Sequence, residues 1–364
     1  MANDLFLQTL AAYDFELPQE QIAQFPASPR ESSRLLVVHR KTGVIEHRQF
    51  TDLIELINES DQIVVNNTQV IRARLLGRRI AEGNGNPVEA GKIEFFMLEE
   101  KAPRTWEGLF HASAKYKAGL KFKVPTPDGL GLHGILVRGS GDSTHGTVVA
   151  EFDRDPLESG AGEVPLPPYV DRTPTAGDEF QYQTVFAKIP GSAAAPTAAL
   201  HFSEELVRRF KARCGGWDEV TLNVGLGTFR PVKDDDLSKH LMHEESFQVS
   251  DSTAEHVNRA KNSGKRIFAV GTTSVRTLES AWKKSDENSL ARLESGSGRT
   301  SIFIRPGYEF QVVDRLLTNF HLPRSTLLML VCAFGGRDLI LKAYDEAVKH
   351  KYRFFSYGDA MVIL

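Results

Sequence analysis

The chain has 364 residues, of which 41% are hydrophobic and 25% are charged, as in an ordinary folded protein. The net charge of −3 gives no sign of nucleic-acid binding by the chain as a whole, so any RNA contact must rest on local basic patches. The sequence contains no run of eighteen apolar residues, so it predicts no membrane span. Its two cysteines, Cys214 and Cys332, are too few for a disulfide framework. We expect a cytoplasmic protein of two domains.

The first sixty-six residues predict the start of an α/β domain. Alternating segments at 34–40 and 44–50 flank a Lys-Thr-Gly turn and predict a β-hairpin. Residues 51–60 have the pattern of a helix, and 61–68 read as a buried strand that stops at an Asn-Asn-Thr turn.

The pattern changes between about residues 70 and 152. Short alternating segments there are separated by turn-forming stretches such as GNGNP, TPDG and GSGDSTHG. Such spacing is typical of a small all-β barrel. Four arginines, Arg72, Arg74, Arg78 and Arg79, alternate along one apparent strand edge in this segment, either as a solvated face or as a phosphate-binding patch.

Strands and helices alternate again after the barrel segment. A helix over 202–216 has Ser203 as its N-cap, strands are expected within 219–229, 265–271 and 300–308, and helices follow at 325–336 and 337–350. This rhythm predicts an α/β fold: a mostly parallel, barrel-like domain made of residues 1–66 and 155–364, with a small β-barrel domain, 67–154, inserted into it.

Residues 191–202 read GSAAAPTAALHF, a run of small side chains that ends at His201. Gly191 and Pro196 argue against one uninterrupted helix. Either the small residues serve close packing, or they let the backbone around Ala195, Pro196 and Thr197 approach something flat or charged.

Two further segments place glycine at the end of a strand. GTTSVR contains Gly271, Thr272, Thr273, Ser274 and Arg276, and its free N–H groups and hydroxyls suit a phosphate or carboxylate, although simple helix capping explains it equally well. VGLGTF is similar to the glycine turns of nucleotide and S-adenosylmethionine sites, but it lacks the third glycine, so an ordinary tight turn is the alternative. Its residues of interest are Gly225, Gly227, Thr228 and Phe229.

Three segments near the second half of the chain carry histidines or carboxylates. HLMHEE includes His243 and Glu245, which could form a surface cluster, a proton-transfer pair or part of a metal site; because no third ligand follows at standard spacing, we predict no metal. TNFHLPRST places His321 after Phe320, either as a buried core histidine or at a strand-to-helix loop beside a ligand. YRFFSYGDAM sets Asp359 on a glycine turn and is either a packed C-terminal strand or part of the site.

Together these segments resemble one family, the S-adenosylmethionine:tRNA ribosyltransferase-isomerases of queuosine biosynthesis. The similar segments keep their order over nearly the whole chain and include LPPYVDR, GSAAAPTAALHF, VTLNVGLGTFRPV, AVGTTSVRTLES and VDRLLTNFHLPRSTLLMLV. The resemblance implies transfer of the ribosyl part of S-adenosylmethionine to 7-aminomethyl-7-deazaguanine at the tRNA wobble position. The ribose rearranges to give epoxyqueuosine, and adenine and methionine leave. S-adenosylmethionine is then a consumed substrate, no cofactor is needed, and we expect a monomer.

The resemblance assigns roles to the residues above. The sulfonium acidifies the neighbouring C5′–H, so a neutral imidazole suits the base, and adenine needs a proton as it departs. The candidates for proton transfer are His201, His243, His321, Glu245 and Asp359. Aromatic faces suit the sulfonium, and the GTTSVR segment suits the methionine carboxylate. The expected aromatic and remaining substrate contacts are Phe229, Tyr308, Phe320, Tyr357 and Asn319, and the expected tRNA contacts are Arg72, Arg74, Arg78 and Arg79.

The sequence departs from the family pattern at several positions, and two alternatives to this interpretation stay open. The family usually has histidine where this chain has Asn223, which keeps hydrogen bonding but cannot titrate. The glycine turn alone is also compatible with an S-adenosylmethionine-dependent RNA methyltransferase, and the basic clusters alone with a tRNA-binding protein that has no activity.

Overall fold

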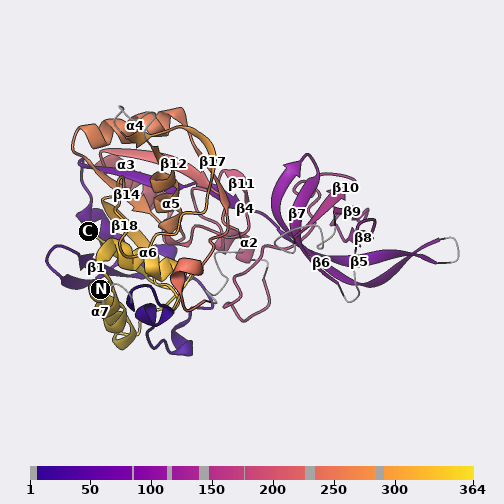
Figure 1. Ribbon diagram of the computed structural model, residues 1–364, viewed down its shortest axis with the longest axis horizontal. Coiled ribbons are helices and arrows are strands. Elements are labelled where there is room, and N and C mark those ends of the chain that lie inside the picture. The colour runs from indigo at the N-terminus through magenta and orange to yellow at the C-terminus, as the bar shows by residue number, and fades with distance from the viewer. Residues whose placement is uncertain are drawn as a thin grey trace.

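The computed structural model describes residues 6–83, 86–112, 117–138, 147–175, 177–225, 234–283 and 291–364. It contains a nine-stranded sheet with helices on both faces and a separate closed barrel of six strands. The barrel projects from one end of the larger domain (Figure 1). The predicted α/β fold with a small β-barrel is therefore confirmed.

The large sheet has the strand order β17-β13-β12-β3-β14-β18-β19-β1-β2. Its strands are β1 (Arg34–His39), β2 (Val44–Gln49), β3 (Asp61–Asn66), β12 (Gly216–Leu222), β13 (Glu245–Val249), β14 (Arg266–Val270), β17 (Gly296–Thr300), β18 (Arg315–Asn319) and β19 (Ala360–Ile363). Four pairings are parallel, β12·β3, β3·β14, β14·β18 and β1·β19. The other four are antiparallel, including the predicted hairpin β1·β2, so the sheet is mixed where a mostly parallel one was expected.

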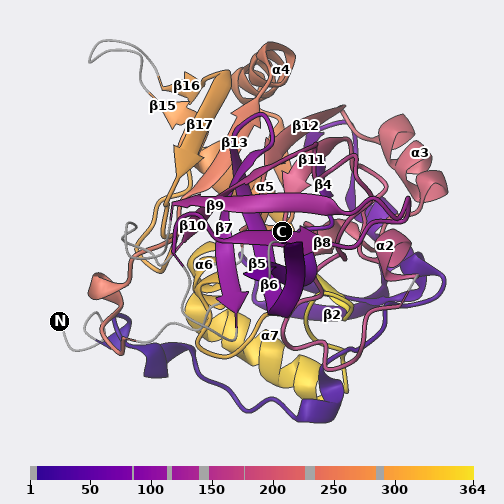
Figure 2. The ribbon, with the colours of Figure 1, turned by 90° about the vertical axis from the view of Figure 1, so that its right-hand side faces the viewer.

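Alternate residues of the central strands enter two different hydrophobic clusters. Leu36 and Val64 pack in one cluster and Leu35 and Ile63 in the other, because successive side chains of a strand point to opposite faces. The first cluster includes residues of α4 (Asp251–Asn262), α5 (Thr272–Ala281), α6 (Thr326–Gly335) and α7 (Arg337–Lys349), and the second includes residues of α3 (Glu204–Arg213). Figures 1 and 2 show α4 and α7 at opposite ends of this domain. Both faces of the sheet are thus covered.

Local signals fix where several helices begin. The hydroxyls of Ser203 and Ser325 accept hydrogen bonds from the backbone N–H groups of Leu206 and Leu328, which confirms the predicted N-cap of α3. Two local predictions were wrong: residues 50–56 form a 3₁₀ helix (Phe50–Leu56) instead of an α-helix, and the expected strand at 300–308 ends at Thr300, where β17 stops.

The barrel strands follow the order β10-β7-β6-β5-β8-β9, and all six pairings are antiparallel. They are β5 (Arg74–Gly83), β6 (Asn86–Ala102), β7 (Thr105–Ala112), β8 (Lys121–Val124), β9 (Leu132–Arg138) and β10 (Val148–Phe152). Phe95, Phe110, Phe122 and Phe152 fill the interior, and a Cβ at Gly134 would lie 2.3 Å from the ring of Phe122. The proposed domain limits at residues 67 and 154 stay a prediction.

Three short elements lie between the two parts of the molecule. β4 (Thr68–Val70) pairs in parallel with β11 (Ile189–Ser192), and α2 (Asp178–Gln181) lies near them in Figure 1. A further two-stranded sheet joins β15 (Trp282–Lys283) to β16 (Arg292–Leu293) and lies beside β17 (Figure 2).

A buried carboxylate joins the amino ends of the central parallel strands. Asp61, at the start of β3, is fully buried and accepts hydrogen bonds from Arg266 at 2.9 and 3.0 Å. The Arg315 guanidinium lies 3.3 Å from the same carboxylate. Because these three residues begin β3, β14 and β18, the carboxyl ends of the same strands meet at the opposite edge of the sheet.

We expect Asp61→Asn to lower the free energy of unfolding by about 3 kcal/mol, the lower end for a broken buried ion pair, because Arg266 is one-third exposed and water screens it. Urea denaturation measures the change. The control is Glu255→Gln, which removes an exposed pair with Arg259 on α4 and should cost less than about 0.5 kcal/mol. Equal losses in the two variants would contradict a special role for Asp61.

Candidate functional site

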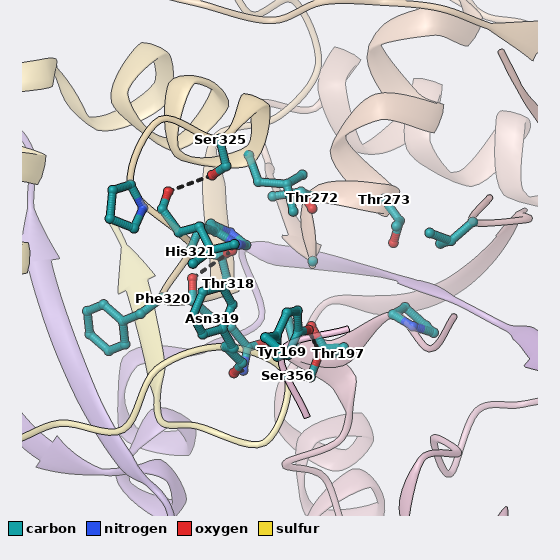
Figure 3. A pocket seen from close by; sticks show the side chains of 18 of the residues that line it. Tyr169, Thr197, Thr272, Thr273, Thr318, Asn319, Phe320, His321, Ser325 and Ser356 are labelled. Carbon is teal, nitrogen blue, oxygen red and sulfur yellow. Dashed lines mark hydrogen bonds between the residues drawn. The ribbon is translucent and has the colours of Figure 1, made fainter. Parts of the chain in front are cut away.

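A cavity of about 430 Å³ lies where the parallel strands end (Figure 3). Its volume falls in the range of small-molecule sites, and its place agrees with the rule that ligands bind at the carboxyl ends of strands in α/β sheets. Its walls come from residues 195–198, 271–273, 318–325 and 355–356, together with Leu10, Tyr169, Val224, Asp235 and Leu327. Five of the predicted segments, GSAAAPTAALHF, VGLGTF, GTTSVR, TNFHLPRST and YRFFSYGDAM, thus meet in one place.

The first wall is the amino end of α5. Gly271, with φ of 87°, turns the chain from β14 into the helix and has no side chain to cap it. The first N–H groups of the helix therefore keep their hydrogen-bonding capacity, and Thr273 Oγ1 is buried without a partner among the described residues. This uncapped terminus suits an anion, which favours the anion-cradle interpretation over simple capping.

Two residues of the GTTSVR segment lie outside this wall. Ser274 is fully buried and its hydroxyl donates to the Val270 carbonyl oxygen at 2.8 Å. The Arg276 guanidinium forms a buried ion pair with Glu245, and neither residue is among those that line the cavity. Only Gly271, Thr272 and Thr273 contribute to the predicted cradle.

The second wall is the run of small residues. Ala195, Pro196, Thr197 and Ala198 all line the cavity, and Thr197–Ala199 form one 3₁₀ turn. A Cβ at Gly271 would lie 3.7 Å from the Cβ of Ala198, so the small side chains allow this loop to pack closely on the turn before α5. The small residues of GSAAAPTAALHF therefore serve close packing and also line the cavity, so both interpretations of this segment hold.

The third wall carries His321. Its ring nitrogen Nε2 lies 2.8 Å from Thr318 Oγ1, and the Thr318 hydroxyl donates to the Asn319 carbonyl oxygen at 3.3 Å. The tautomer with its proton on Nε2 satisfies both contacts at once, because the hydroxyl then accepts from Nε2 and donates to the carbonyl; in this tautomer Nδ1 is an unprotonated acceptor, with no partner in the described part of the chain. Burial lowers the pKa of His321 to about 3, so the ring is neutral near pH 7.

His201 does not line the cavity. Its Nδ1 lies 2.8 Å from Ser33 Oγ, its Nε2 lies 3.2 Å from the Asn319 amide nitrogen, and its ring packs on Phe50. Burial lowers its pKa to about 4. The two histidines of similar sequence context thus lie near Asn319, but only His321 reaches the cavity, and His201 as the base stays a prediction that this geometry does not favour.

Several predicted side chains are held elsewhere by their own partners. The Asp359 carboxylate accepts bonds from the backbone N–H groups of Arg34 and Arg353, at 2.9 and 2.8 Å, and pairs with the Arg34 guanidinium. The Tyr308 hydroxyl donates to Glu279 and the Tyr357 hydroxyl to Asp178. Phe320 itself lines the cavity, but its ring is fully buried against Tyr344, Tyr352 and Phe354.

The aromatic faces at the cavity come from residues that the sequence analysis did not select. Tyr169 and Phe355 stack with their ring centroids 4.3 Å apart, and both line the cavity. They belong to the segments LPPYVDR and YRFFSYGDAM, on which the family resemblance rests. The sequence therefore identified both segments but could not predict that the two rings stack on each other.

A second groove, of about 680 Å³, lies between the barrel and the large sheet. It is lined by Gly225, His243, Glu245 and Asn223 from the sheet side and by residues such as Trp106 and Glu107 from the barrel. Val224 lines the first cavity and Gly225 the second, so the glycine turn lies between them. Gly227, Thr228 and Phe229 lie outside the described residues.

The four barrel arginines are mostly paired. Arg72 lies 2.9 Å from Glu179, Arg74 lies 2.9 Å from Glu94, and Arg78 lies 3.7 Å from Glu89. β5 has a neighbour on each side, so it is not the edge strand that the alternation suggested, and Arg79 is partly buried. Their contact with tRNA stays a prediction.

A ligand-sized cavity at the carboxyl ends of parallel strands, walled by an uncapped helix terminus and a neutral histidine, is typical of α/β enzymes acting on small molecules. A family model described as queuosine biosynthesis protein matches residues 10–363. The chain belongs to this family. Within the described residues, no helix has the length and apolar character needed to cross a membrane.

Relatives named S-adenosylmethionine:tRNA ribosyltransferase-isomerase cover almost the whole chain. That of Clostridioides difficile is 47% identical over 96% of this chain and 98% of its own, and that of Anaeromyxobacter sp. strain K is 47% identical over 98% and 99%. The crystal structure of S-adenosylmethionine tRNA ribosyltransferase from Thermotoga maritima is similar with a TM-score of 0.52 and 37% identity, covering 97% of this chain and 100% of that one.

The two buried histidines predict how stability depends on pH. Their pKa values in the folded protein, about 4 for His201 and about 3 for His321, lie below the ordinary 6.5. The unfolded chain therefore takes up protons first, and the stability that neutral histidines contribute is complete above pH 6.5 and is lost as pH falls toward 3. We expect His201→Gln and His321→Gln each to reduce the pH slope of the unfolding free energy by up to about 1.4 kcal/mol per pH unit between pH 6 and 5.

Urea denaturation at pH 7, 6 and 5 measures this slope. His111→Gln is the control because its side chain is exposed on the barrel. A slope that stays the same in both buried variants would show that these rings are not held neutral by burial.

Proposed function

We propose that this protein transfers and isomerises the ribosyl moiety of S-adenosylmethionine onto 7-aminomethyl-7-deazaguanine at the wobble position of tRNA. Epoxyqueuosine in tRNA, adenine and methionine are the products. S-adenosylmethionine is consumed as a substrate, no cofactor takes part, and the protein acts as a cytoplasmic monomer. The observation that supports this most is one cavity in which a neutral histidine faces an uncapped helix terminus, in a chain similar over its full length to relatives of that name.

The two ends of the methionine part have different partners in this proposal. The carboxylate binds the first N–H groups of α5 and the Thr273 hydroxyl, which has no partner within the described ranges; the helix dipole there favours a negative charge. The sulfonium lies toward the stacked rings of Tyr169 and Phe355, whose faces attract a cation. These choices replace Arg276, which pairs with Glu245, and Tyr308, whose hydroxyl donates to Glu279, because neither residue lines the cavity.

His321 takes the proton in the first step. The C5′–H bond next to the sulfonium breaks, its proton moves to His321 Nδ1, and the electron pair stays on carbon as the ylide that attacks the modified base. The sulfonium cation becomes a neutral ylide while the imidazole becomes a cation, so the net charge of the cavity does not change. This offsets the cost of placing a charge on a buried ring whose pKa is about 3.

Labelled S-adenosylmethionine and tRNA carrying the deazaguanine precursor test the function. We expect adenine and methionine in equal amounts and a modified nucleoside in the tRNA. His321→Gln should lower turnover by about 10²–10⁴-fold, with binding of S-adenosylmethionine changed less than a few-fold. His133→Gln, on the barrel surface, is the matched control.

Two outcomes of this assay contradict the proposal. S-adenosylhomocysteine with a methylated tRNA would identify a methyltransferase, and tRNA binding without any turnover would identify a binding protein. Full activity of His321→Gln would exclude that residue as the base while leaving the reaction in place.

The anion cradle has a separate test at Gly271. A residue with a side chain is strained at φ of 87°, by about 1–3 kcal/mol, and would shift the first N–H groups of α5. We expect Gly271→Ala to raise the KM for S-adenosylmethionine about tenfold or more. Gly264→Ala is the control, since its φ of 72° is also left-handed but it follows α4 with nothing within 4 Å. Equal KM values for the two variants would count against the cradle.

A further inference from the structure

Asn319 has a buried oxygen that the protein leaves unsatisfied. It is the last residue of β18, is 2% exposed and lines the cavity. Its Oδ1 has no hydrogen-bond partner in the part of the chain that the structure describes. A buried carbonyl without a donor is costly, so its presence at a cavity wall points to a donor supplied from outside the chain.

The orientation of the Asn319 amide follows from its other contacts. Its Nδ2 lies 3.1 Å from the Phe355 carbonyl oxygen and 3.2 Å from His201 Nε2. Because a backbone carbonyl can only accept, the nitrogen must face Phe355, and a flipped amide would set two carbonyl oxygens against each other. Both amide protons are used in this way, and the oxygen is directed away from them.

His201 completes this arrangement. Since the amide donates to its Nε2, the imidazole proton sits on Nδ1 and is donated to Ser33 Oγ at 2.8 Å. A protonated ring would present an N–H to the amide N–H and break the contact. Burial, which lowers the pKa of His201 to about 4, keeps the ring in the accepting form.

The place of Asn319 in the cavity limits what it can bind. Its partner Phe355 stacks on Tyr169, and Tyr169 bonds to Ser356, so these residues form one side of the cavity. Figure 3 shows Asn319, Tyr169 and Ser356 near one another and Thr273 on the other side of the view. With the carboxylate at Thr273, the nucleoside part of the substrate lies toward Asn319.

We propose that Asn319 is a binding residue whose Oδ1 accepts a hydrogen bond from the nucleoside part of S-adenosylmethionine, and that His201 is the positioning residue that holds this amide. The proposal rests on the proposed function. The donor is either a ribose hydroxyl or the adenine amino group, the only O–H and N–H donors of that part of the substrate. His201 acts through Asn319 and transfers no proton.

Substrate analogues combined with variants test this assignment. Calorimetry with the whole protein measures the affinity for S-adenosylmethionine and for its 2′-deoxy, 3′-deoxy and N6-dimethyl analogues. We expect one of the three to bind the unchanged protein about tenfold more weakly than S-adenosylmethionine. In Asn319→Ala the affinity difference between that analogue and S-adenosylmethionine should disappear, because the acceptor is gone. The analogue that shows the effect identifies the donor.

His201 variants separate positioning from catalysis. His201→Leu removes the acceptor for the amide and should reproduce the loss of discrimination, raising KM with kcat within a few-fold. His201→Gln, whose side-chain oxygen can accept the same bond, should restore discrimination. Asn258→Ala is the matched control, because that amide also makes two bonds, to Leu293, but far from the cavity residues.

Several results would overturn the proposal. One is discrimination that persists in Asn319→Ala, and another is a collapse of kcat in His201→Leu with unchanged affinity for S-adenosylmethionine. If His201→Leu does not fold, the analogue series in the unchanged protein and in Asn319→Ala decides alone. Failure of the unchanged protein to bind S-adenosylmethionine at all would instead refute the proposed function.

Discussion

The register of three parallel strands depends on one buried carboxylate. Asp61 lies opposite Arg266 in the β3·β14 pairing and also binds Arg315 at the start of β18. A slip of one residue would turn every side chain of a strand to the other face of the sheet. It would also separate the charges at Asp61. Because the amino ends are joined there, Gly271 and Asn319 emerge at the same edge, where the cavity forms.

The cavity wall holds polar groups whose hydrogen-bonding capacity the protein leaves unused, as it also does at a few buried groups elsewhere, such as Trp106 Nε1 and Arg79 Nε among the described residues. The buried carboxylate of Glu279 shows the opposite arrangement, because it accepts from three backbone N–H groups and a tyrosine hydroxyl. In the cavity wall, Thr273 Oγ1 and Asn319 Oδ1 have no partner among the described residues, and the end of α5 is uncapped. Polar groups held in place without partners are prepared for a ligand, and the fold keeps them at a cost in stability.

Sequence reasoning predicted the larger features and missed the fine ones for a physical reason. Periodicity and turn residues show the α/β rhythm, the barrel and the cap at Ser203, because each depends on neighbours in the chain. His201 and His321 lie in similar local sequences, and the residues that distinguish them are distant in the chain. Ser33 and Phe50 contact the first ring, while Nδ1 of the second has no partner among the described residues. The sequence also could not predict the hydrogen bonds of the Tyr308 and Tyr357 hydroxyls, because their partners Glu279 and Asp178 come from other segments.

The glycine turn joins two cavities, and its contacts explain why its residues divide between them. Val224 donates to Ser192 Oγ at 2.9 Å and accepts from Ala193 N at 3.0 Å, so it is tied to the small-residue wall. The next residue, Gly225, donates to Glu245, and Glu245 pairs with Arg276 in the middle of α5. The helix whose amino end faces the cavity is thus bonded through two charged side chains to the groove beside the barrel. A reaction that unites a small substrate with a macromolecular one requires both to be held close together, and the cavity and the groove share this turn.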